Sequence, residues 1–297
     1  MKRLTIVAPI LLLAVSAAAQ VNDTYVIPAA GNTPGAFNTT WATQFSVFNP
    51  QAYPLRVSVT FVPTPGSGNS DLVEKLITVP ANSVAFSDNI LSDLFNMSGQ
   101  GALLVATFPE DNPSVADSVI ARAFLVVTDT YNNARTGTFG QTVPGVWAGL
   151  QDFATDGISA IAHGIRNNIA FRTNVGAVNL GRTSVKMRIN VYDMNGNTIQ
   201  QNIPFTLPPL GHFQDALPVQ VDRGSLEFFV DDSTKQAVVF PYVSVVDNGS
   251  GDPQYQSPTL LATPDVLFRK AAKVDVSFAR SVRAHAERLG EGQLQTK

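Results

Sequence analysis

A nine-residue segment occurs twice in this 297-residue chain, and it constrains the fold more than any other feature. Trp41–Asn49 reads WATQFSVFN, and Phe171–Asn179 reads FRTNVGAVN. Both copies begin with an aromatic residue, carry Thr and an amide at positions three and four, and end on Asn. The segments that follow, Leu55–Phe61 and Val185–Val191, align at the same offset without a gap. The sequence therefore predicts an internal duplication.

Three positions define the repeat: an aromatic residue, a threonine and an asparagine. They are Trp41, Thr43 and Asn49 in the first copy, and Phe171, Thr173 and Asn179 in the second. Threonine suits a strand, and a terminal Asn can bond nearby backbone to shape a turn. The aromatic residues are interpreted as core anchors. Two copies of one binding site would also explain the repeat, but we favour the structural interpretation.

Apolar and polar residues alternate along Leu55–Phe61 and again along Val185–Val191, which is typical of a strand with one wet face. Half-buried strands favour antiparallel sheets. The pair Asn195-Gly196 favours a tight hairpin turn of type I′, with both residues at positive φ, after the second of these strands. Short strands, frequent turns and two periods of similar length predict an all-β fold of two tandem antiparallel β-sandwich, Ig-like domains.

The N-terminus has the pattern of a secretory signal. Lys2 and Arg3 precede the apolar run Leu4–Val15, and Ala17–Ala19 supplies small residues for cleavage before Gln20. A membrane anchor is the alternative, but the run is short for a bilayer. No other segment of the sequence has the length and apolarity of a membrane span. We therefore expect an exported protein, located in the periplasm, on the cell surface or outside the cell.

The expected organisation is a signal peptide at 1–19, sandwich repeats at 20–147 and 148–262, and a basic tail at 263–297, helical or disordered. From Asp265 onward there are seven Lys and Arg against four Asp and Glu, whereas Gln20–Pro264 holds eleven against nineteen. An acidic body argues against a nucleic-acid partner, because phosphate contacts need a clustered positive face. A solvated tail is favoured over one that docks on an anionic envelope polymer.

The chain resembles a tandem module of exported, functionally uncharacterised proteins of soil bacteria such as acidobacteria. The residues that carry the resemblance are Trp41–Phe45, Gly164–Asn179 and Val245–Asp252, and it covers about Ile27–Pro258. It implies two Ig-like sandwiches and a cell-envelope or extracellular setting. The family has no assigned activity, so the resemblance transfers no functional residue, and the C-terminal extension departs from its pattern.

Catalytic motifs are weak. There is no cysteine, and His163, His212 and His285 fall in separate regions without zinc-ligand spacing. The segment Asn96–Gly101 lacks the first glycine of a serine-hydrolase elbow. A Ser-His-Asp set on another framework stays open but has no positive support.

Paired carboxylates occur at three places, where a glycosidase would need two acids facing one sugar. They are Glu110-Asp111, Asp152 with Asp156, and Asp231-Asp232. Because these acids fall in expected turns, we interpret them as hydrated surface carboxylates.

Two weak ligand sites remain. Asp247, Asn248 and Asp252 offer oxygen ligands around tight glycines and could hold calcium, although a plain Asx turn is favoured and no other cofactor is expected. Trp147 has no counterpart in the other repeat; it either wedges the two modules together, which we favour, or stays exposed as a platform for a ligand. Phe37 and Tyr53 are the loop aromatics that could join it on a sugar face.

The leading hypothesis is a non-enzymatic structural, adhesive or interaction protein of the envelope or extracellular space. A pair of carbohydrate-binding modules is the alternative, and a secreted hydrolase without a recognisable motif comes third. The expected partner is an envelope polymer, a polysaccharide or another protein, and the oligomeric state is left open.

Export gives the first test. When the full-length gene is expressed in a secreting bacterial host, the exported protein is expected to begin at Gln20, because the small-residue site precedes it. Intact-mass measurement and N-terminal sequencing check this. A mature protein that retains Lys2 and Arg3 would contradict the cleavage site.

Overall fold

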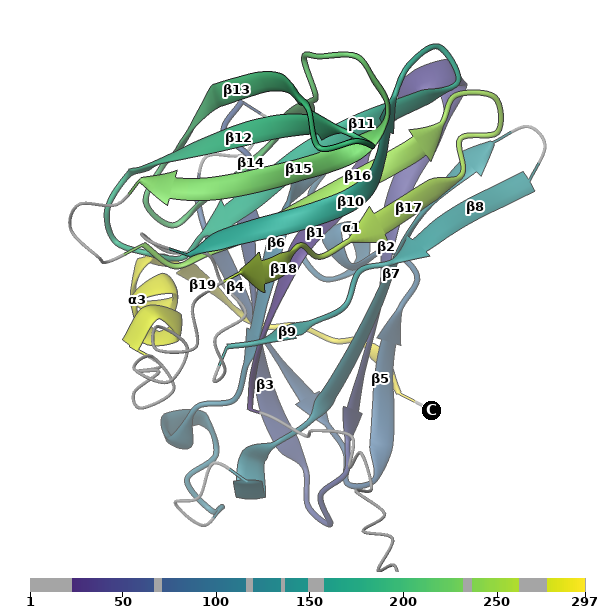
Figure 1. Cartoon of the computed structure of the whole chain (residues 1–297). Coiled ribbons are helices and arrows are strands. Elements are labelled where there is room, and N and C mark those ends of the chain that lie inside the picture. The colour runs from purple at the N-terminus through teal and green to yellow at the C-terminus, as the bar shows by residue number, and fades with distance from the viewer. Residues whose placement is uncertain are drawn as a thin grey trace, which may run out of the picture.

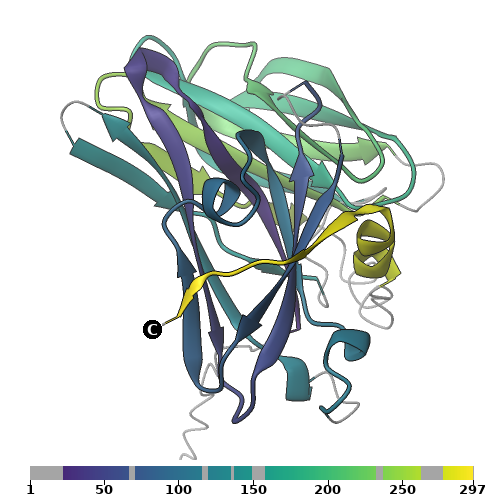
Figure 2. The same ribbon diagram turned by 180° about the vertical axis from the view of Figure 1, so that it is seen from behind.

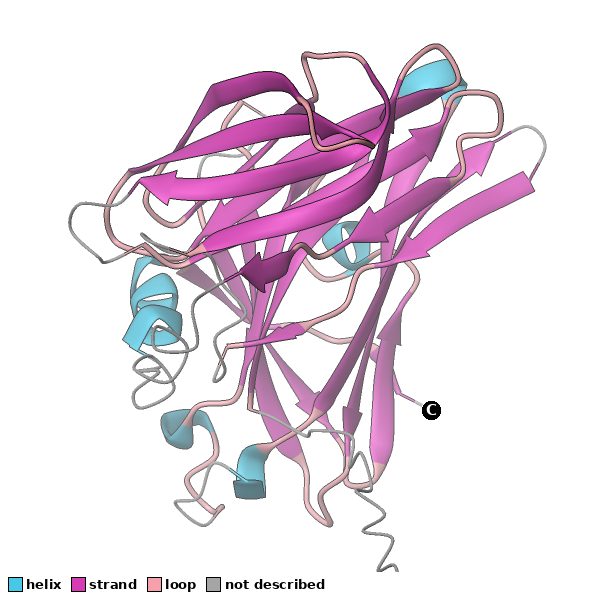
Figure 3. Cartoon of the chain, in the orientation of Figure 1, coloured by secondary structure: helices cyan, strands magenta, loops and turns pink. Residues whose placement is uncertain are grey.

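The computed structural model describes residues 23–66, 71–115, 120–134, 137–148, 158–231, 237–261 and 277–296. Strands dominate these residues, and most strand pairs are antiparallel, so the predicted all-β class is confirmed (Figure 3). Among the described helices, none combines the length and apolarity needed to cross a bilayer. The strands form two sandwich-like groups, with the second lying across the upper part of the first (Figure 1).

The first strand group contains β1 to β9. Their bounds are β1 Thr24–Pro34, β2 Thr40–Asn49, β3 Leu55–Pro63, β4 Val73–Val79, β5 Ser83–Ser87, β6 Gly99–Ala106, β7 Leu125–Ala134, β8 Gly137–Thr142 and β9 Val146–Trp147. One layer has the order β4-β3-β6-β1-β9 and the other β5-β2-β7-β8. Four short helices lie between these strands: η1 Ala36–Asn38, α1 Ile90–Asp93, η2 Pro109–Asp111 and η3 Ile120–Arg122.

Strand β1 connects the two layers of this group. It pairs with β6 from Thr24 to Asn32, and its last residues, Asn32–Pro34, pair with β2. The register with β6 shifts between Ile27 and Ala30. Pro28 lies within this shift, and because proline has no N–H to donate to a ladder, it favours a bulge there.

The second strand group contains β10 to β18. Their bounds are β10 Ser159–Asn167, β11 Phe171–Asn179, β12 Val185–Asp193, β13 Thr198–Leu207, β14 Gly211–Ala216, β15 Val221–Asp231, β16 Val239–Asp247, β17 Pro253–Gln256 and β18 Thr259–Leu261. The layers have the orders β13-β12-β15-β10-β18 and β14-β11-β16-β17. Each strand therefore holds the position that the strand nine places earlier holds in the first group.

Three apolar clusters hold the protein together. The first lies inside the first group, around Phe45, Phe61 and Phe124, and the second lies inside the second group, around Phe228. The third lies between the groups, and we call it the shared core. The first group contributes Val26, Val62, Leu104 and Phe108, the second contributes Val178, Leu180 and Phe240, and the C-terminal helix contributes Ala279 and Val282.

The shared core changes the environment of β3. A wet face was expected on both repeated strands, and on β12 Lys186 is exposed as predicted. On β3 the expectation holds for Arg56, whose side chain is 40% exposed, and is wrong for Ser58 and Thr60, which are only 2% and 1% exposed. The outer face of the β4-β3-β6-β1 layer is covered by the second group and the C-terminal segment, so both faces of β3 are buried from Val57 onward.

Helix α3 (Ser277–His285) and strands β19 (Glu287–Glu291) and β20 (Gln295–Thr296) form the C-terminal segment. The tail was expected to be helical or disordered; a helix is present, and the two strands that follow it were not predicted. Strand β19 pairs in parallel with β4, and β20 pairs antiparallel with β5. Seen from behind, the segment crosses the first group as a yellow band from α3 to the C-terminus (Figure 2).

The repeated asparagines connect strand ends within each group. Asn49 is fully buried, and its Nδ2 donates to the carbonyl oxygens of Tyr53, Val79 and Pro80. Its Oδ1 accepts from the backbone N–H of Gln51. Asn179 is equally buried and makes the corresponding bonds to the carbonyls of Thr183 and Pro208 and to the N–H of Gly181. One side chain thus bonds several backbone groups at the ends of neighbouring strands.

Removing either asparagine should destabilise the fold. Asn49→Ala and Asn179→Ala are each expected to lower the free energy of unfolding by about 2 to 3 kcal/mol, because buried carbonyl groups lose their donor. Urea denaturation followed by circular dichroism measures this change. Gln200→Ala, at an exposed position on β13, is the control and should change stability by less than about 0.5 kcal/mol. A similar small change for both asparagine variants would contradict the role assigned to them.

Candidate functional site: a groove between the strand groups

A groove of about 240 Å³ lies between the two strand groups. The first group lines it with Trp41 of β2, Gln100 of β6, Thr130 of β7 and Gln141 of β8; the second lines it with Arg172 and Asn174 of β11, Gln214 of β14, and Tyr242 and Ser244 of β16. The lining thus combines two aromatic rings with several neutral amides and hydroxyls. Among the described lining residues, Arg172 is the only one that carries a charge.

A hydrogen-bonded chain runs from the groove into the contact between the groups. Tyr242 donates its hydroxyl to Oε1 of Gln214 at 2.7 Å, and Gln214 is 3.5 Å from Oε1 of Gln100 across the contact. The Tyr242 oxygen lies 2.9 Å from Nε2 of His212, whose Nδ1 lies 2.5 Å from Oγ1 of Thr64.

Gly176 leaves the space that the Tyr242 ring occupies. Gly176 is the cross-strand partner of Tyr242 on β11, and a Cβ atom at Gly176 would lie 2.2 Å from the ring carbon Cζ. Any larger residue would therefore push the ring away from Gln214. On its other sides the ring stacks on His212 and on Tyr255, with centroids 5.8 Å apart in both pairs.

The buried groups beneath the groove are neutral near pH 7. Burial lowers the pKa of His212 to about 3, and burial also raises the pKa of Tyr242 well above its ordinary value. General acid–base catalysis requires a group that gains or loses a proton near the working pH, and neither His212 nor Tyr242 does so near neutral pH. The chain of bonds instead fixes the orientation of the Gln214 amide at the groove surface.

Trp41 was expected to be a core anchor, and that expectation is wrong. The indole is half-buried and lines the groove. Gly35 makes room for it, since a Cβ at Gly35 would lie 2.4 Å from the indole Nε1. Phe171 does pack against the second core, and the guanidinium of Arg166 lies 4.7 Å from the centre of its ring.

The repeated threonines are both fully buried. Oγ1 of Thr43 accepts from the N–H of Gly31 and bonds the hydroxyl of Thr130, whose residue lines the groove. Oγ1 of Thr173 donates to the carbonyl of Arg166. Thr43 therefore supports the strands that form the groove, whereas Thr173 joins β11 to β10, the preceding strand, which lies in the other layer of the second group.

The aromatic ligand residues predicted from sequence lie elsewhere. Trp147 belongs to β9, pairs with Tyr25 and packs on the first core, while its neighbours Val146 and Ala148 contribute to the shared core. Val146 and Ala148 therefore lie between the two strand groups, where Trp147 was expected, because alternate side chains of a strand face opposite ways. Tyr53 packs on the first core and donates its hydroxyl to the carbonyl of Ala121, so it offers no exposed ring. Phe37 lies in η1, and its side chain falls outside the described residues.

The weak calcium site forms an Asx turn. Oδ1 of Asp247 accepts from the N–H groups of Gly249 and Ser250 at 2.8 and 2.7 Å, and these bonds lower the pKa of its carboxyl group. Oδ1 of Asn248 accepts from Arg172, and the carbonyl of Asp252 accepts from the N–H of Asp247. Within the described ranges, no group of three His, Asp or Glu residues is arranged to hold a metal ion.

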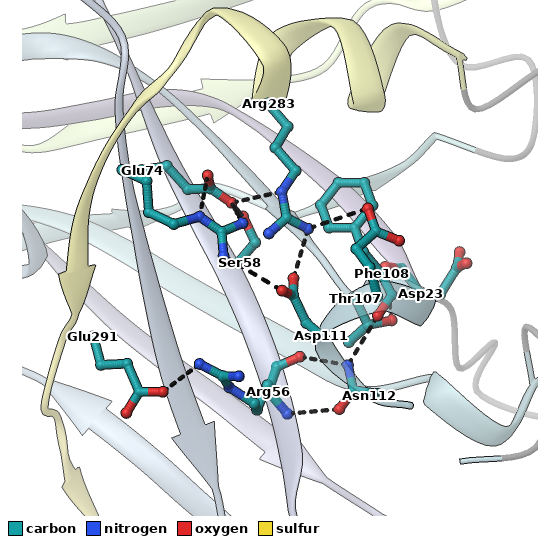
Figure 4. Close-up of polar contacts among 12 residues, drawn as sticks. Asp23, Arg56, Ser58, Glu74, Thr107, Phe108, Asp111, Asn112, Arg283 and Glu291 are labelled. Atoms are coloured by element: carbon teal, nitrogen blue, oxygen red, sulfur yellow. Dashed lines mark hydrogen bonds and ion pairs between the residues drawn. The ribbon is translucent and has the colours of Figure 1, made fainter. Parts of the chain in front are cut away.

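The acid pair Glu110-Asp111 was expected to be hydrated, and for Asp111 this is wrong. Asp111 is 6% exposed and faces Arg283 of α3 at 2.5 Å and Arg288 of β19 at 3.4 Å. Glu74 of β4, 1% exposed, pairs with the same two arginines at 3.2 and 3.3 Å (Figure 4). The sequence did not predict this cluster, because its members come from three regions far apart in the chain: β4, η2 and the C-terminal segment. Asp152, Asp156 and Asp232 lie outside the described residues.

Comparison with models of known protein families finds no family that matches this chain. A search of curated proteins likewise finds no significant match. The groove is therefore interpreted from its own chemistry. Sequence patterns could not have found it, because its amides come from separate strands and no local motif marks them.

Acid should destabilise the protein through His212. The unfolded chain binds a proton at His212 below about pH 6.5, whereas the folded protein does so only near pH 3, so stability falls as the pH falls through this window. Between pH 7 and pH 5 the expected loss is about 2 kcal/mol. Urea denaturation at both pH values measures it.

His212→Gln should remove most of this pH dependence. His163→Gln, at an exposed position on β10, should leave it in place. Equal pH dependence in the His212→Gln variant and the unmodified protein would contradict the buried, neutral state of His212.

Proposed function

We propose that this chain is an exported, non-enzymatic interaction protein whose two strand groups together bind a neutral saccharide. The setting follows from the signal-like N-terminus and from the resemblance to exported bacterial modules, and in that setting we take an envelope polysaccharide as the ligand source. The same proposal takes the two groups as Ig-like domains that arose by duplication. Their matching strand order supports this.

The observation that carries the proposal is the composition of the groove. A sugar presents an apolar face of C–H groups and a rim of hydroxyls that both donate and accept hydrogen bonds. The exposed part of the Trp41 indole can cover such a face, and amides such as Gln100 and Gln141 can donate and accept at its rim. The volume of about 240 Å³ suits one or two sugar rings.

The groove favours binding over hydrolysis. A glycosidase places two carboxyl groups on either side of one bond, and no Asp or Glu is among the described residues that line the groove. The nearest titratable groups beneath it, His212 and Tyr242, are held neutral by burial. Binding requires only fixed donors and acceptors, which the Tyr242–Gln214 bond provides.

Assembly through open sheet edges receives less support. In the first group the edges of β4 and β5 are occupied by β19 and β20. In the second group the edge strand β13 contains Pro204 and a register shift in its pairing with β12, and both features disfavour the addition of a strand. The adhesive role is therefore assigned to the groove.

Glycan-array screening followed by calorimetry with the best-bound oligosaccharide tests the proposal. Trp41→Ala and Gln141→Ala are each expected to weaken binding at least about tenfold, since they remove the stacking face and one polar contact. Gln200→Ala, which replaces an exposed amide on β13, should bind like the unmodified protein. Retention of no glycan, or binding that neither groove variant weakens, would contradict the saccharide groove.

A further inference from the structure

The surface that holds the C-terminal segment is a binding site for a peptide, and its occupant need not come from the same chain. We propose that residues 277–296 exchange between copies, so that the C-terminal segment of one molecule docks on the first strand group of a second. This proposal does not depend on the ligand of the groove.

The docking surface has two charged receptors beside a sheet edge. Glu74 and Asp111 are almost completely buried, and the C-terminal segment brings both cations that face them, Arg283 and Arg288. The guanidinium of Arg283 also lies 4.2 Å from the centre of the Phe108 ring. Because buried carboxylates need opposite charges close by, Glu74 and Asp111 favour a segment that carries two guanidinium groups with the spacing of Arg283 and Arg288.

Backbone pairing then aligns the segment. The N–H of Glu287 donates to the carbonyl of Leu72 at 2.9 Å and the N–H of Gly292 donates to the carbonyl of Leu76 at 2.6 Å, along the edge of β4 that does not pair with β3. Gly292 fits closely, since a Cβ there would lie 2.1 Å from Leu94 Cδ1. This is recognition by strand addition, with main-chain bonds for affinity and the two arginines for specificity.

The segment is separable from the body. The first core contains no fully buried residue from it, only the partly buried Leu294, and every side chain of β19 is exposed. Only Ala279 and Val282 enter the shared core. Both strand groups therefore keep their own cores when the segment leaves.

The connection permits exchange. The chain leaves the second group at Leu261 of β18, and the segment begins at Ser277, so fifteen residues, 262–276, join the two. A stretch of that length can span up to about 50 Å. Every docking contact is made with a surface that a second copy also presents, which is the requirement for exchanging an element between copies. High local concentration favours docking within one molecule, and crowding on a surface favours exchange.

The absence of cysteine allows a direct test in the full-length chain. Lys75 on β4 donates to the carbonyl of Leu289 on β19 at 2.9 Å, and the residues before them, Glu74 and Arg288, are strand partners, so cysteines at these two positions are within reach of a short linker when the segment is docked. One variant carries Lys75→Cys and an affinity tag, and the other carries Leu289→Cys. The two are mixed at high concentration, incubated, treated with a short bifunctional thiol reagent, and the cross-linked peptides are identified by mass spectrometry.

If the segment exchanges, mixing the Lys75→Cys and Leu289→Cys chains should give a covalent heterodimer linked through positions 75 and 289. Its yield should be at least about tenfold above the heterodimer yield of the control mixture, Lys75→Cys with Leu261→Cys, whose second cysteine is at an exposed position on β18. Adding Arg283→Glu to the Leu289→Cys chain should remove this excess. The double variant Lys75→Cys/Leu289→Cys tests the docking itself and should cross-link within one chain. Efficient cross-linking in the double variant, with no excess heterodimer from the mixed single variants, would overturn exchange; no cross-linking in either would overturn the docking surface.

Discussion

Burial of both faces of the β4-β3-β6-β1 layer is the constraint on which the rest of the structure depends. The inner face packs in the core of the first group, and the outer face packs against the second group and helix α3. Residues such as Val62 and Leu104 would otherwise be exposed apolar area on an open sheet. Because this layer is covered, the two groups form one body, and the groove has walls from both.

Polar groups inside the contact are accommodated by hydrogen bonding. Thr64, His212, Tyr242 and Gln214 form a continuous chain, and burial keeps His212 neutral. An unpaired polar group at such a depth would cost free energy, so the chain also specifies how the two groups align. Its last amide faces the groove, which links the alignment of the groups to the geometry of the proposed saccharide site.

The two strand groups share a strand order but differ at their edges. The first has its β4 and β5 edges covered by the C-terminal segment, whereas the corresponding strands of the second, β13 and β14, have no such cover among the described residues. The buried carboxylates explain the difference: Glu74 lies on β4 and receives Arg283 and Arg288. Counted back from the equivalent pairs Leu55–Val79 and Val185–Leu207, the position of Glu74 on β4 corresponds to Asn202 on β13, which offers no charge to an arginine.

The sequence by itself determined the features that depend on near neighbours. Alternating apolar residues predicted the strands, and the position of Asn49 at a strand end predicted backbone bonding. The Asn195-Gly196 pair predicted the β12–β13 hairpin, but the expected type I′ turn is wrong, because only Gly196 takes a positive φ. Each is set by local periodicity, turn geometry or the reach of a short side chain.

Only the tertiary structure decided which surfaces are covered. The repeat marks Trp41 as important but does not tell that the indole lines a groove, and the strand pattern of β3 does not reveal that Ser58 is buried. The amides of the groove and the arginine partners of Glu74 come from segments separated by tens to hundreds of residues. Their meeting depends on how the two groups and the C-terminal segment pack, and no local pattern encodes that packing.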